Sequence, residues 1–403
     1  MTPGDLDAGE ECARALDAAD PLAAMRQRFH VPIGSGGREV IYLVGNSLGL
    51  APRRAARYVA DELDRWARLG VSGHFEGEHP WMPYHEELTA PMARVVGARP
   101  EEVVVMNSLT VNLHLMMAGF YRPTGDRHRV LIEEHAFPSD HFAVASQIRH
   151  HGLDPSECLV TVAPRVGEET LRTADVVDAI RDQGSSLALV LLPGVQYYTG
   201  QALAMADVTT AGHEVGAMVG FDLAHAVGNL ELDLHDWGPD FAVWCNYKYL
   251  NGGPGAVGGC FVHERHLGRA DVPRLEGWWG TAKDTRFEML TEFDPIPTVE
   301  AWQLSNPPIL AMAALRASLE IFDEVGGMAA VRAKALDQVT YLDYLLDELF
   351  ADEVECITPR APDARGGQLS LRLRNPIDGR AVFRALEADD VACDWRHPDV
   401  IRI

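Results

Sequence analysis

Residues 218–248 read MVGFDLAHAVGNLELDLHDWGPDFAVWCNYK and contain two short apolar runs, 218–223 and 241–246, each of which has a polar side chain at or next to its end. Apolar runs without alternating polarity are typical of strands buried on both faces of a sheet. Similar runs occur at 101–107, 129–134, 187–193 and 259–263. Helix-like stretches such as 139–152 and 173–184 separate most of them. This alternation predicts an α/β fold, with a largely parallel sheet and helices on both of its faces.

Three longer stretches have helical periodicity and suggest how the chain divides. Apolar residues recur at three- and four-residue steps over 52–69, 309–324 and 328–350, so we expect amphipathic helices on the surface. After residue 309 the long helices are followed by GGQLSLRLR and AVFRALEADDVACDW, which suits a small α+β domain. The first ~45 residues contain no strand of the large sheet. We therefore expect a large domain, 46–308, and a small domain formed by 1–45 and 309–403.

Composition restricts the partners and the compartment. The 403 residues include 35 basic and 59 acidic side chains, and the net charge of −24 disfavours nucleic acid and anionic membranes as partners. The six cysteines are widely scattered, so we expect neither a metal site nor disulfides. The N-terminus lacks the basic and apolar stretches of a signal peptide, and no apolar run approaches the ~20 residues of a membrane span. These features predict a cytoplasmic protein.

Ligands of open parallel sheets bind beyond the carboxyl ends of the strands, where the chain places a lysine. Lys248 follows the run 241–246 and lies among aromatic residues before a glycine-rich turn, in NYKYLNGGP. Partial desolvation there would lower the pKa of the amine and favour its attack on a carbonyl. Lys248 is therefore a candidate Schiff-base lysine, although a single lysine is more often an exposed loop residue.

Upstream residues strengthen that interpretation. Asp222 ends the run 218–223, and a carboxylate can keep the ring nitrogen of pyridoxal 5'-phosphate protonated. His225, three residues further on, could stack on or hydrogen-bond the cofactor, although a single histidine is more often a core residue. The ordered set Asp222, His225, Asp240 and Lys248 is more specific than any one of its members. It predicts a pyridoxal 5'-phosphate enzyme that acts on an amino acid.

Two predicted helix starts offer donors for the cofactor's phosphate. The segment Ser108-Leu-Thr110 opens one helix with hydroxyls, backbone amides and the positive end of a helix dipole. Phe137-Pro-Ser-Asp140 opens another. There Phe137 could cover the ring, and Ser139 serves either as a helix cap or as a ligand.

Seven stretches, in order along the chain, resemble kynureninase, a member of the class V branch of fold type I pyridoxal-phosphate enzymes. They are Gly45-Asn-Ser-Leu-Gly-Leu50, Met106-Asn-Ser-Leu-Thr-Val-Asn-Leu-His114, Ala136-Phe-Pro-Ser-Asp-His141, Gly220-Phe-Asp-Leu-Ala-His-Ala-Val-Gly-Asn229, Asn246-Tyr-Lys-Tyr-Leu-Asn251, Gly277-Trp-Trp-Gly280 and Ser305-Asn-Pro-Pro-Ile-Leu310.

The resemblance implies specific roles for residues of these motifs. It assigns the Schiff base to Lys248 and the contact with the pyridine nitrogen to Asp222. Residues implied around the cofactor are Leu109, Thr110, Phe137, Ser139, Asp140, His225 and Tyr247. Trp278 and Asn306 would reach the phosphate from the neighbouring subunit of a homodimer with shared active sites. His74 would recognise the substrate's aromatic ring, and Arg402 the α-carboxylate, which a guanidinium binds through two hydrogen bonds.

The reaction implied is hydrolysis of L-kynurenine to anthranilate and L-alanine, or of 3-hydroxykynurenine to 3-hydroxyanthranilate, in tryptophan catabolism and NAD biosynthesis. Lys248 would move the α-proton, and Tyr247 is a candidate to relay protons at the carbonyl or to bind the phosphate. The resemblance also implies a further segment after Ile403. Pro193 stands where some relatives have a serine near the cofactor.

Two other functions remain open. A cysteine desulfurase or selenocysteine lyase of the same fold needs a nucleophilic cysteine on a mobile loop, whereas Cys356 lies in VECIT, which predicts a strand and a buried structural thiol. The other is a protein that binds pyridoxal phosphate without turnover. Anthranilate formed from kynurenine would support the first function, and sulfide released from cysteine would support the desulfurase. A Schiff-base absorbance band without anthranilate would support the non-catalytic binding protein.

Overall fold

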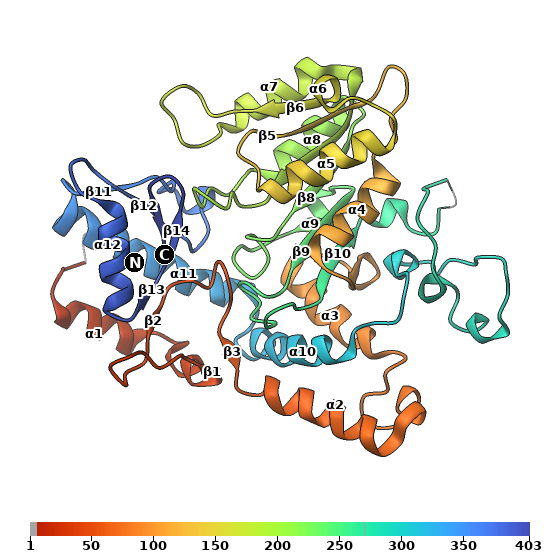
Figure 1. Cartoon of the computed structure of the whole chain (residues 1–403), viewed down its shortest axis with the longest axis horizontal. Helices are drawn as coiled ribbons and strands as arrows, with labels where there is room; N and C mark the ends of the chain where they lie inside the picture. The colour runs from red at the N-terminus through yellow and green to blue at the C-terminus, as the bar shows by residue number, and fades with distance from the viewer. Residues whose placement is uncertain (1–5, 270) are drawn as a thin grey trace.

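The computed structural model describes residues 6–269 and 271–403 and contains a seven-stranded sheet in the order β4-β10-β9-β8-β7-β5-β6 (Figure 1). Strand β10 runs opposite to the other six and is antiparallel to both β4 and β9, while the remaining pairs are parallel, so the predicted largely parallel α/β sheet is confirmed. The sequence did not predict β6, a partly exposed edge strand without a continuous apolar run. The strands are β4 (Val103–Val105), β5 (Arg129–Glu133), β6 (Leu159–Val162), β7 (Leu187–Pro193), β8 (Met218–Asp222), β9 (Phe241–Cys245) and β10 (Gly258–Val262).

Helices cover both faces of this sheet and form two hydrophobic cores. In β7, Leu189 and Leu191 belong to one core, and Val190 and Leu192 to the other. The first core includes α4 (Leu109–Phe120), α5 (Pro138–His150) and α6 (Pro155–Cys158). The second includes α2 (Ala55–Leu69), α3 (Tyr84–Val96), α7 (Thr173–Gln183), α8 (Met205–Glu214), α9 (Leu234–Trp237) and α10 (Ile309–Glu324).

Helix α10 has the predicted bounds but does not lie on the surface as expected. Eight of its residues are buried, because α2 and α3 pack against it. The helix at 328–350 is also confirmed, as α11. No helix among the described residues is both long and apolar enough to cross a membrane.

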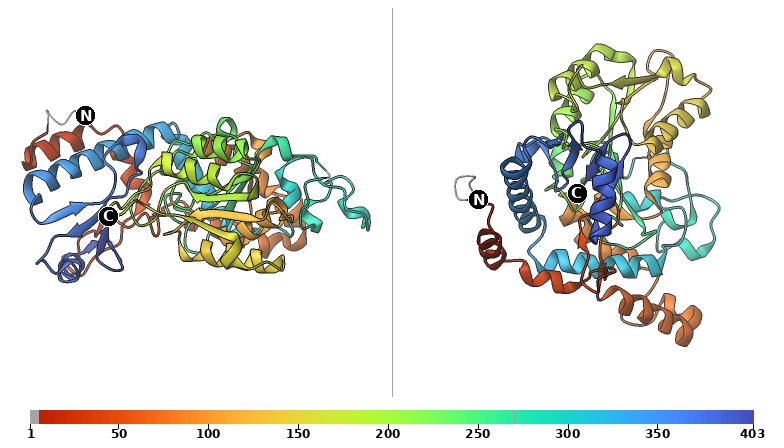
Figure 2. Two further views of the ribbon diagram at one scale, coloured as in Figure 1. Left: turned by 90° about the horizontal axis from the view of Figure 1, so that it is seen from above. Right: turned by 60° about the vertical axis from the view of Figure 1, so that its left-hand side comes forward.

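The two ends of the chain lie side by side, away from the large sheet (Figure 2). Strand β2 pairs in parallel with β13, and Lys334 of α11 forms an ion pair with Asp20. The C-terminal residues form an antiparallel sheet in the order β11-β12-β15-β14. The division into domains 46–308 and 1–45 with 309–403 stays a prediction. The elements here are α1 (Glu10–Ala19), β1 (Phe29–His30), β2 (Ile41–Tyr42), β3 (Ala51–Pro52), α11 (Met328–Phe350), β11 (Val354–Cys356), β12 (Ser370–Leu373), α12 (Gly379–Ala388), β13 (Val391–Ala392), β14 (Asp394–Arg396) and β15 (Val400–Arg402).

Candidate active site

A cavity of about 260 Å³ lies at the carboxyl ends of β5, β7, β8 and β9, the edge where the sequence predicted a ligand site. Most of the residues predicted around the cofactor line it. These are Leu109, Thr110, Phe137, Ser139, Asp140, Asp222, His225, Tyr247 and Lys248.

Lys248 follows β9 and is largely buried in this cavity. Its Nζ lies 2.9 Å from Nε2 of His225. Burial lowers the pKa of Lys248, and the positive charges of Arg402 and Arg396 lower it further, against the opposite effects of Cys245 and Asp222. A lowered pKa increases the neutral fraction of the amine, which is the form that attacks a carbonyl.

Two buried carboxyl groups face each other beside Lys248. Asp222 ends β8, and its Oδ1 accepts a hydrogen bond from the amide of Ala224 at 2.8 Å. Asp140 comes from the first turn of α5. Burial raises the pKa of Asp140 well above its usual value, and the neighbouring charges of Asp222 and Glu133 add to the rise. Burial raises the pKa of Asp222 as well, but the amide of Ala224 and the charge of Lys248 oppose that rise, so of the two carboxyl groups Asp140 holds a proton more readily.

The hydroxyls at the two helix starts point toward each other. Thr110 lies in the first turn of α4 and Ser139 in the first turn of α5, and their oxygens are 3.0 Å apart. Ser139 does not cap α5, because Phe137 occupies the cap position. Two hydroxyls beside two helix N-termini fit a phosphate.

Four residues carried over from the family do not line the cavity. His74, in a 3-10 helix (Gly70–His74), packs edge-on against Trp81. Trp278 is partly exposed, and Asn306 is exposed. Arg402 is fully buried behind the cavity wall, where it donates to the carbonyl of Tyr197 at 2.6 Å and pairs with Asp394.

The sequence interpretation missed several lining residues, namely Asn46, Ser47, Glu133, Val195, Tyr197, Ala224 and Arg396. For Asn46 a signal existed, because it belongs to the motif Gly45–Leu50. Gly49 of this motif donates its amide to Tyr247 O at 2.8 Å, and a β-carbon there would overlap the carbonyl oxygen of Lys248. Glycine thus lets the motif approach the lysine loop. Glu133 and Arg396 had no comparable local signal.

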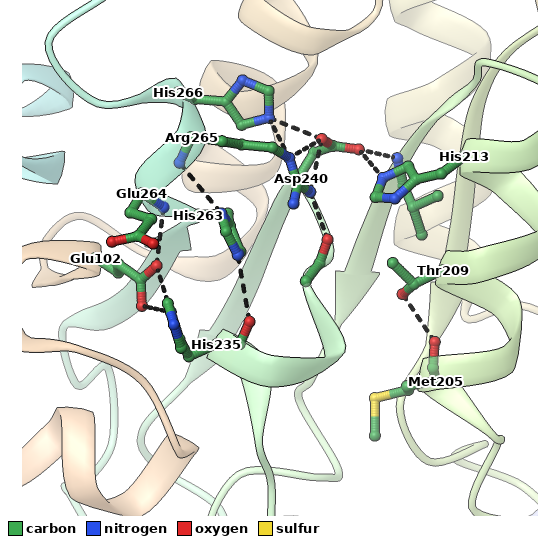
Figure 3. A network of polar contacts seen from close by, with 12 residues as sticks. Glu102, Met205, Thr209, His213, His235, Asp240, His263, Glu264, Arg265 and His266 are labelled. Carbon is green, nitrogen blue, oxygen red and sulfur yellow. Dashed lines mark hydrogen bonds and ion pairs between the residues drawn. The ribbon is translucent and has the colours of Figure 1, made fainter.

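Asp240, which the sequence analysis grouped with Asp222, His225 and Lys248, lies at the amino ends of the strands. It is therefore not part of the site at their carboxyl ends that contains Lys248. It precedes β9, whereas Lys248 follows that strand. Figure 3 shows its carboxylate accepting hydrogen bonds from His213 at 3.0 Å and His266 at 2.7 Å, beside Arg265. Burial alone would raise the pKa of Asp240, but these partners hold it below its usual range.

Comparison with known proteins identified close relatives. The chain is 56% identical to the kynureninase of Myxococcus xanthus over 100% of its own length and 93% of the relative's. It is 54% identical to the kynureninase of Koribacter versatilis, over 100% and 94%. Residues 331–403 match the family model described as "Kynureninase C-terminal domain".

Solved structures share the fold at low sequence identity. A C-DES mutant "with GLY Covalenty Linked to the PLP-cofactor" has a TM-score of 0.76 and 19% identity, covering 94% of this chain and 93% of that one. The cysteine desulfurase of Thermococcus onnurineus has a TM-score of 0.72 and 18% identity, over 96% and 92%. In the present chain, Cys356 lies in β11, as predicted, although its thiol is only partly buried. Cys356 does not line the cavity.

Proposed function

The chain belongs to the kynureninase family, and we propose that it uses pyridoxal 5'-phosphate to hydrolyse the Cβ–Cγ bond of L-kynurenine, forming anthranilate and L-alanine. The observation that carries this proposal is the cavity in which Lys248 and His225 lie 2.9 Å apart beside the Asp140–Asp222 pair. The activity on 3-hydroxykynurenine and the cytoplasmic location predicted from the sequence are part of the same proposal.

The residues that line the cavity fit the cofactor. Asp140 Oδ1 and His225 Nδ1 are buried without hydrogen-bond partners, so the cavity has polar atoms that a polar ligand would satisfy. Asp222 would hold the proton on the ring nitrogen, while Thr110 and Ser139 would bind the phosphate. Pyridoxal phosphate, when bound, supplies an electron sink that makes the substrate's α-proton acidic and the Cβ–Cγ bond labile.

Lys248 and Tyr247 would handle the protons. The amine of Lys248 would anchor the cofactor and, when free, would take the substrate's α-proton. Burial raises the pKa of Tyr247, so its phenol stays protonated and can donate at the γ-carbonyl as water adds.

A homodimer would complete the site. Trp278 packs against Phe287 with ring centroids 5.5 Å apart, Phe287 against Phe75 at 6.2 Å, and Phe75 against His74 at 6.2 Å. The side chains of Phe75 and Phe287 are 62% and 51% exposed. An aromatic cluster on one surface suits burial against a second copy of the chain. His74 and Trp278 would then reach the partner's cavity together, with Asn306 nearby.

The test is to load the purified protein with pyridoxal phosphate and follow anthranilate fluorescence on addition of L-kynurenine. We expect anthranilate and L-alanine in equal amounts, and none of either from the Lys248→Ala variant. Sulfide release from cysteine, without anthranilate, would support the desulfurase instead. A cofactor absorbance band without either product would support a non-catalytic binding protein.

A further inference from the structure

A second cavity, of about 320 Å³, adjoins the cavity that contains Lys248, which is called here the cofactor cavity. The second cavity lies between the large sheet and the C-terminal sheet, because its lining includes the end of β5 and Arg372 of β12. His135 in this lining is exposed, so the second cavity opens at the surface. Among the described residues, only Glu133 and Tyr197 line both cavities. The wall between the two cavities therefore contains one carboxyl group and one phenol.

Gln196 determines which oxygen of Glu133 can carry a proton. Oε1 of Gln196 accepts hydrogen bonds from the amides of Tyr198 at 2.6 Å and Thr199 at 2.8 Å, so its Nε2 faces Glu133. This Nε2 donates to Oε1 of Glu133 at 3.2 Å and to the carbonyl of His135 at 3.0 Å. Because Oε1 of Glu133 accepts a hydrogen bond, a proton on this carboxyl group resides on Oε2. Within the described part of the chain, no side chain or amide is hydrogen-bonded to Oε2, so this atom is available for proton transfer.

Of the two wall residues, Glu133 is the one that can change its protonation state near neutral pH. Burial raises the pKa of Glu133 to about 7, and the hydrogen bond from Gln196 opposes that rise. Burial also raises the pKa of Tyr197 from its already high value, so the phenol keeps its proton. The charged side chains around Glu133 are Asp140, Asp222, Lys248 and Arg396 in the cofactor cavity, and Glu169, Arg372 and Asp399 in the second cavity. Acids and bases occur on both sides, and burial remains the main determinant of the pKa of Glu133. A group transfers protons efficiently when its pKa lies near the working pH.

The proposed hydrolysis releases one proton in each turnover. The water molecule supplies the oxygen and one hydrogen of the new carboxyl group of anthranilic acid, and its second hydrogen ends on Cβ of L-alanine. A carboxylic acid ionises at neutral pH, so one proton remains in the cofactor cavity. This cavity opens beside Ser47 and Phe137, which are exposed, and a bound substrate would occupy that opening. The proton then needs a second way out.

We propose that Glu133 carries this proton from the cofactor cavity to the second cavity. Glu133 takes up the proton at Oε2 and gives it to water in the second cavity, which is large enough for several water molecules. It returns to its ionised form once in each turnover. The inference rests on the proposed function, because the proton comes from the hydrolysis of kynurenine.

The experiment measures proton release and product formation in the same single turnover. Holoprotein in excess over L-kynurenine is mixed in weakly buffered solution at neutral pH, where the absorbance of a pH indicator reports protons and fluorescence reports anthranilate. In the wild type, protons and anthranilate should appear at the same rate. In Glu133→Gln, proton release should slow about 10- to 100-fold, because an amide cannot take up and give up the proton. Proton release at the wild-type rate would overturn the proposal.

A matched control and a buffer separate a relay from a structural role. Glu134 is the next residue in the chain, is exposed and lines neither cavity, so Glu134→Gln should release protons at the wild-type rate. Imidazole, a small buffer able to enter the second cavity, should restore proton release by Glu133→Gln and leave the wild type unchanged. A slow variant that imidazole does not restore would overturn the proposal, because that result is expected when the substitution only disturbs the structure.

A second measurement does not depend on turnover. The infrared carboxyl band of protonated Glu133 is identified by its absence from the spectrum of Glu133→Gln. With L-alanine bound to the holoprotein, this band should shift as soon as the protein is mixed into D₂O, because the second cavity still reaches solvent. A band that stays unshifted would overturn the proposal.

Two further outcomes keep the test decisive. If Glu133→Gln does not load the cofactor, Glu133→Asp, which keeps the carboxyl group but shortens its reach, should release protons at an intermediate rate that imidazole raises, and release at the wild-type rate would overturn the proposal. A wild type that forms no anthranilate would contradict the proposed function and this inference together. A wild type that forms anthranilate, with proton release unaffected in Glu133→Gln, would contradict this inference alone.

Discussion

Buried carboxylates have different surroundings at the two ends of the strands of the large sheet, which are called here the amino edge and the carboxyl edge. At the amino edge, Asp240 accepts hydrogen bonds from His213, His266 and the amide of Val219, and its pKa is lowered. At the carboxyl edge, Asp222 accepts one backbone hydrogen bond, and burial raises its pKa. Strand β8 joins the two, since Val219 lies near its start and Asp222 at its end. Removing a buried charge that has many partners destabilises the fold, because those partners are left buried and unpaired. A buried charge with few partners is a candidate for a ligand site.

Glu102, also buried at the amino edge, likewise has several hydrogen-bond partners. Its carboxylate accepts hydrogen bonds from the amides of Arg99 and Glu264 and lies 3.0 Å from Nδ1 of His235 (Figure 3). By contrast, Glu133 at the carboxyl edge has Gln196 as its hydrogen-bond partner at 3.2 Å. The contrast therefore extends beyond one pair of aspartates.

The largest effect is expected from Asp222→Asn. Without a carboxylate, the ring nitrogen of the cofactor loses the group that keeps it protonated, so turnover should fall by roughly 10²- to 10⁴-fold. The free energy of unfolding should not fall, because a poorly satisfied buried charge is removed. Steady-state kinetics and denaturant unfolding test the two statements. Near-normal turnover by Asp222→Asn would contradict the placement of the active site at the carboxyl ends of the strands.

Asp240→Asn should have the reverse profile. The side chains of His213, Arg265 and His266 lose the buried carboxylate that they contact, so the free energy of unfolding should fall by about 3–5 kcal/mol. Turnover per folded molecule should stay unchanged. Because the pKa of Asp240 is lowered on folding, its stabilisation is complete above the unfolded value of about 3.9 and is lost as the pH falls further. Unfolding curves of both proteins at pH 7 and pH 3 measure the difference, which should shrink at pH 3.

Glu133→Gln should change the pH dependence of stability. Burial raises the pKa of Glu133 from 4.5 to about 7. Between these values the unfolded chain ionises and the folded chain does not, so rising pH lowers the wild-type free energy of unfolding by about 1.4 kcal/mol for each unit of pKa shift. The variant should lack this loss. Unfolding measured at pH 5 and pH 8 tests it, and the same dependence in both proteins would show that Glu133 ionises normally.

The smallest effect is expected from Cys356→Ala. Cys356 lies in the C-terminal sheet, at neither edge of the large sheet, and its thiol is partly exposed. Kynurenine hydrolysis should be unchanged, and stability should change by no more than about 1 kcal/mol. A loss of turnover with either kynurenine or cysteine would give this thiol a catalytic role.

The sequence by itself determined most strands of the large sheet and which residues lie at the carboxyl ends of two of them. Continuous apolar runs are typical of strands buried on both faces of a sheet, so six of the seven strands of the large sheet could be predicted from them. A residue at the end of such a run, or just after it, lies near the strand's carboxyl end, and this placed Asp222 at the end of β8 and Lys248 just after β9. The predicted helix starts supplied Thr110, Phe137 and Ser139, and the family motifs added Leu109 and Tyr247; all of them line the cavity.

Only the tertiary structure decided which charges have partners. Asp240 was grouped with Lys248 in one ordered set along the sequence, and the fold puts the two residues at opposite ends of β9. Arg396 and Arg402 lie six residues apart in sequence, yet one lines the cavity and the other is buried. Local sequence reports which face of an element is apolar. Desolvation and hydrogen bonding depend on groups brought together from distant parts of the chain, and these determine where a charge can act on a ligand.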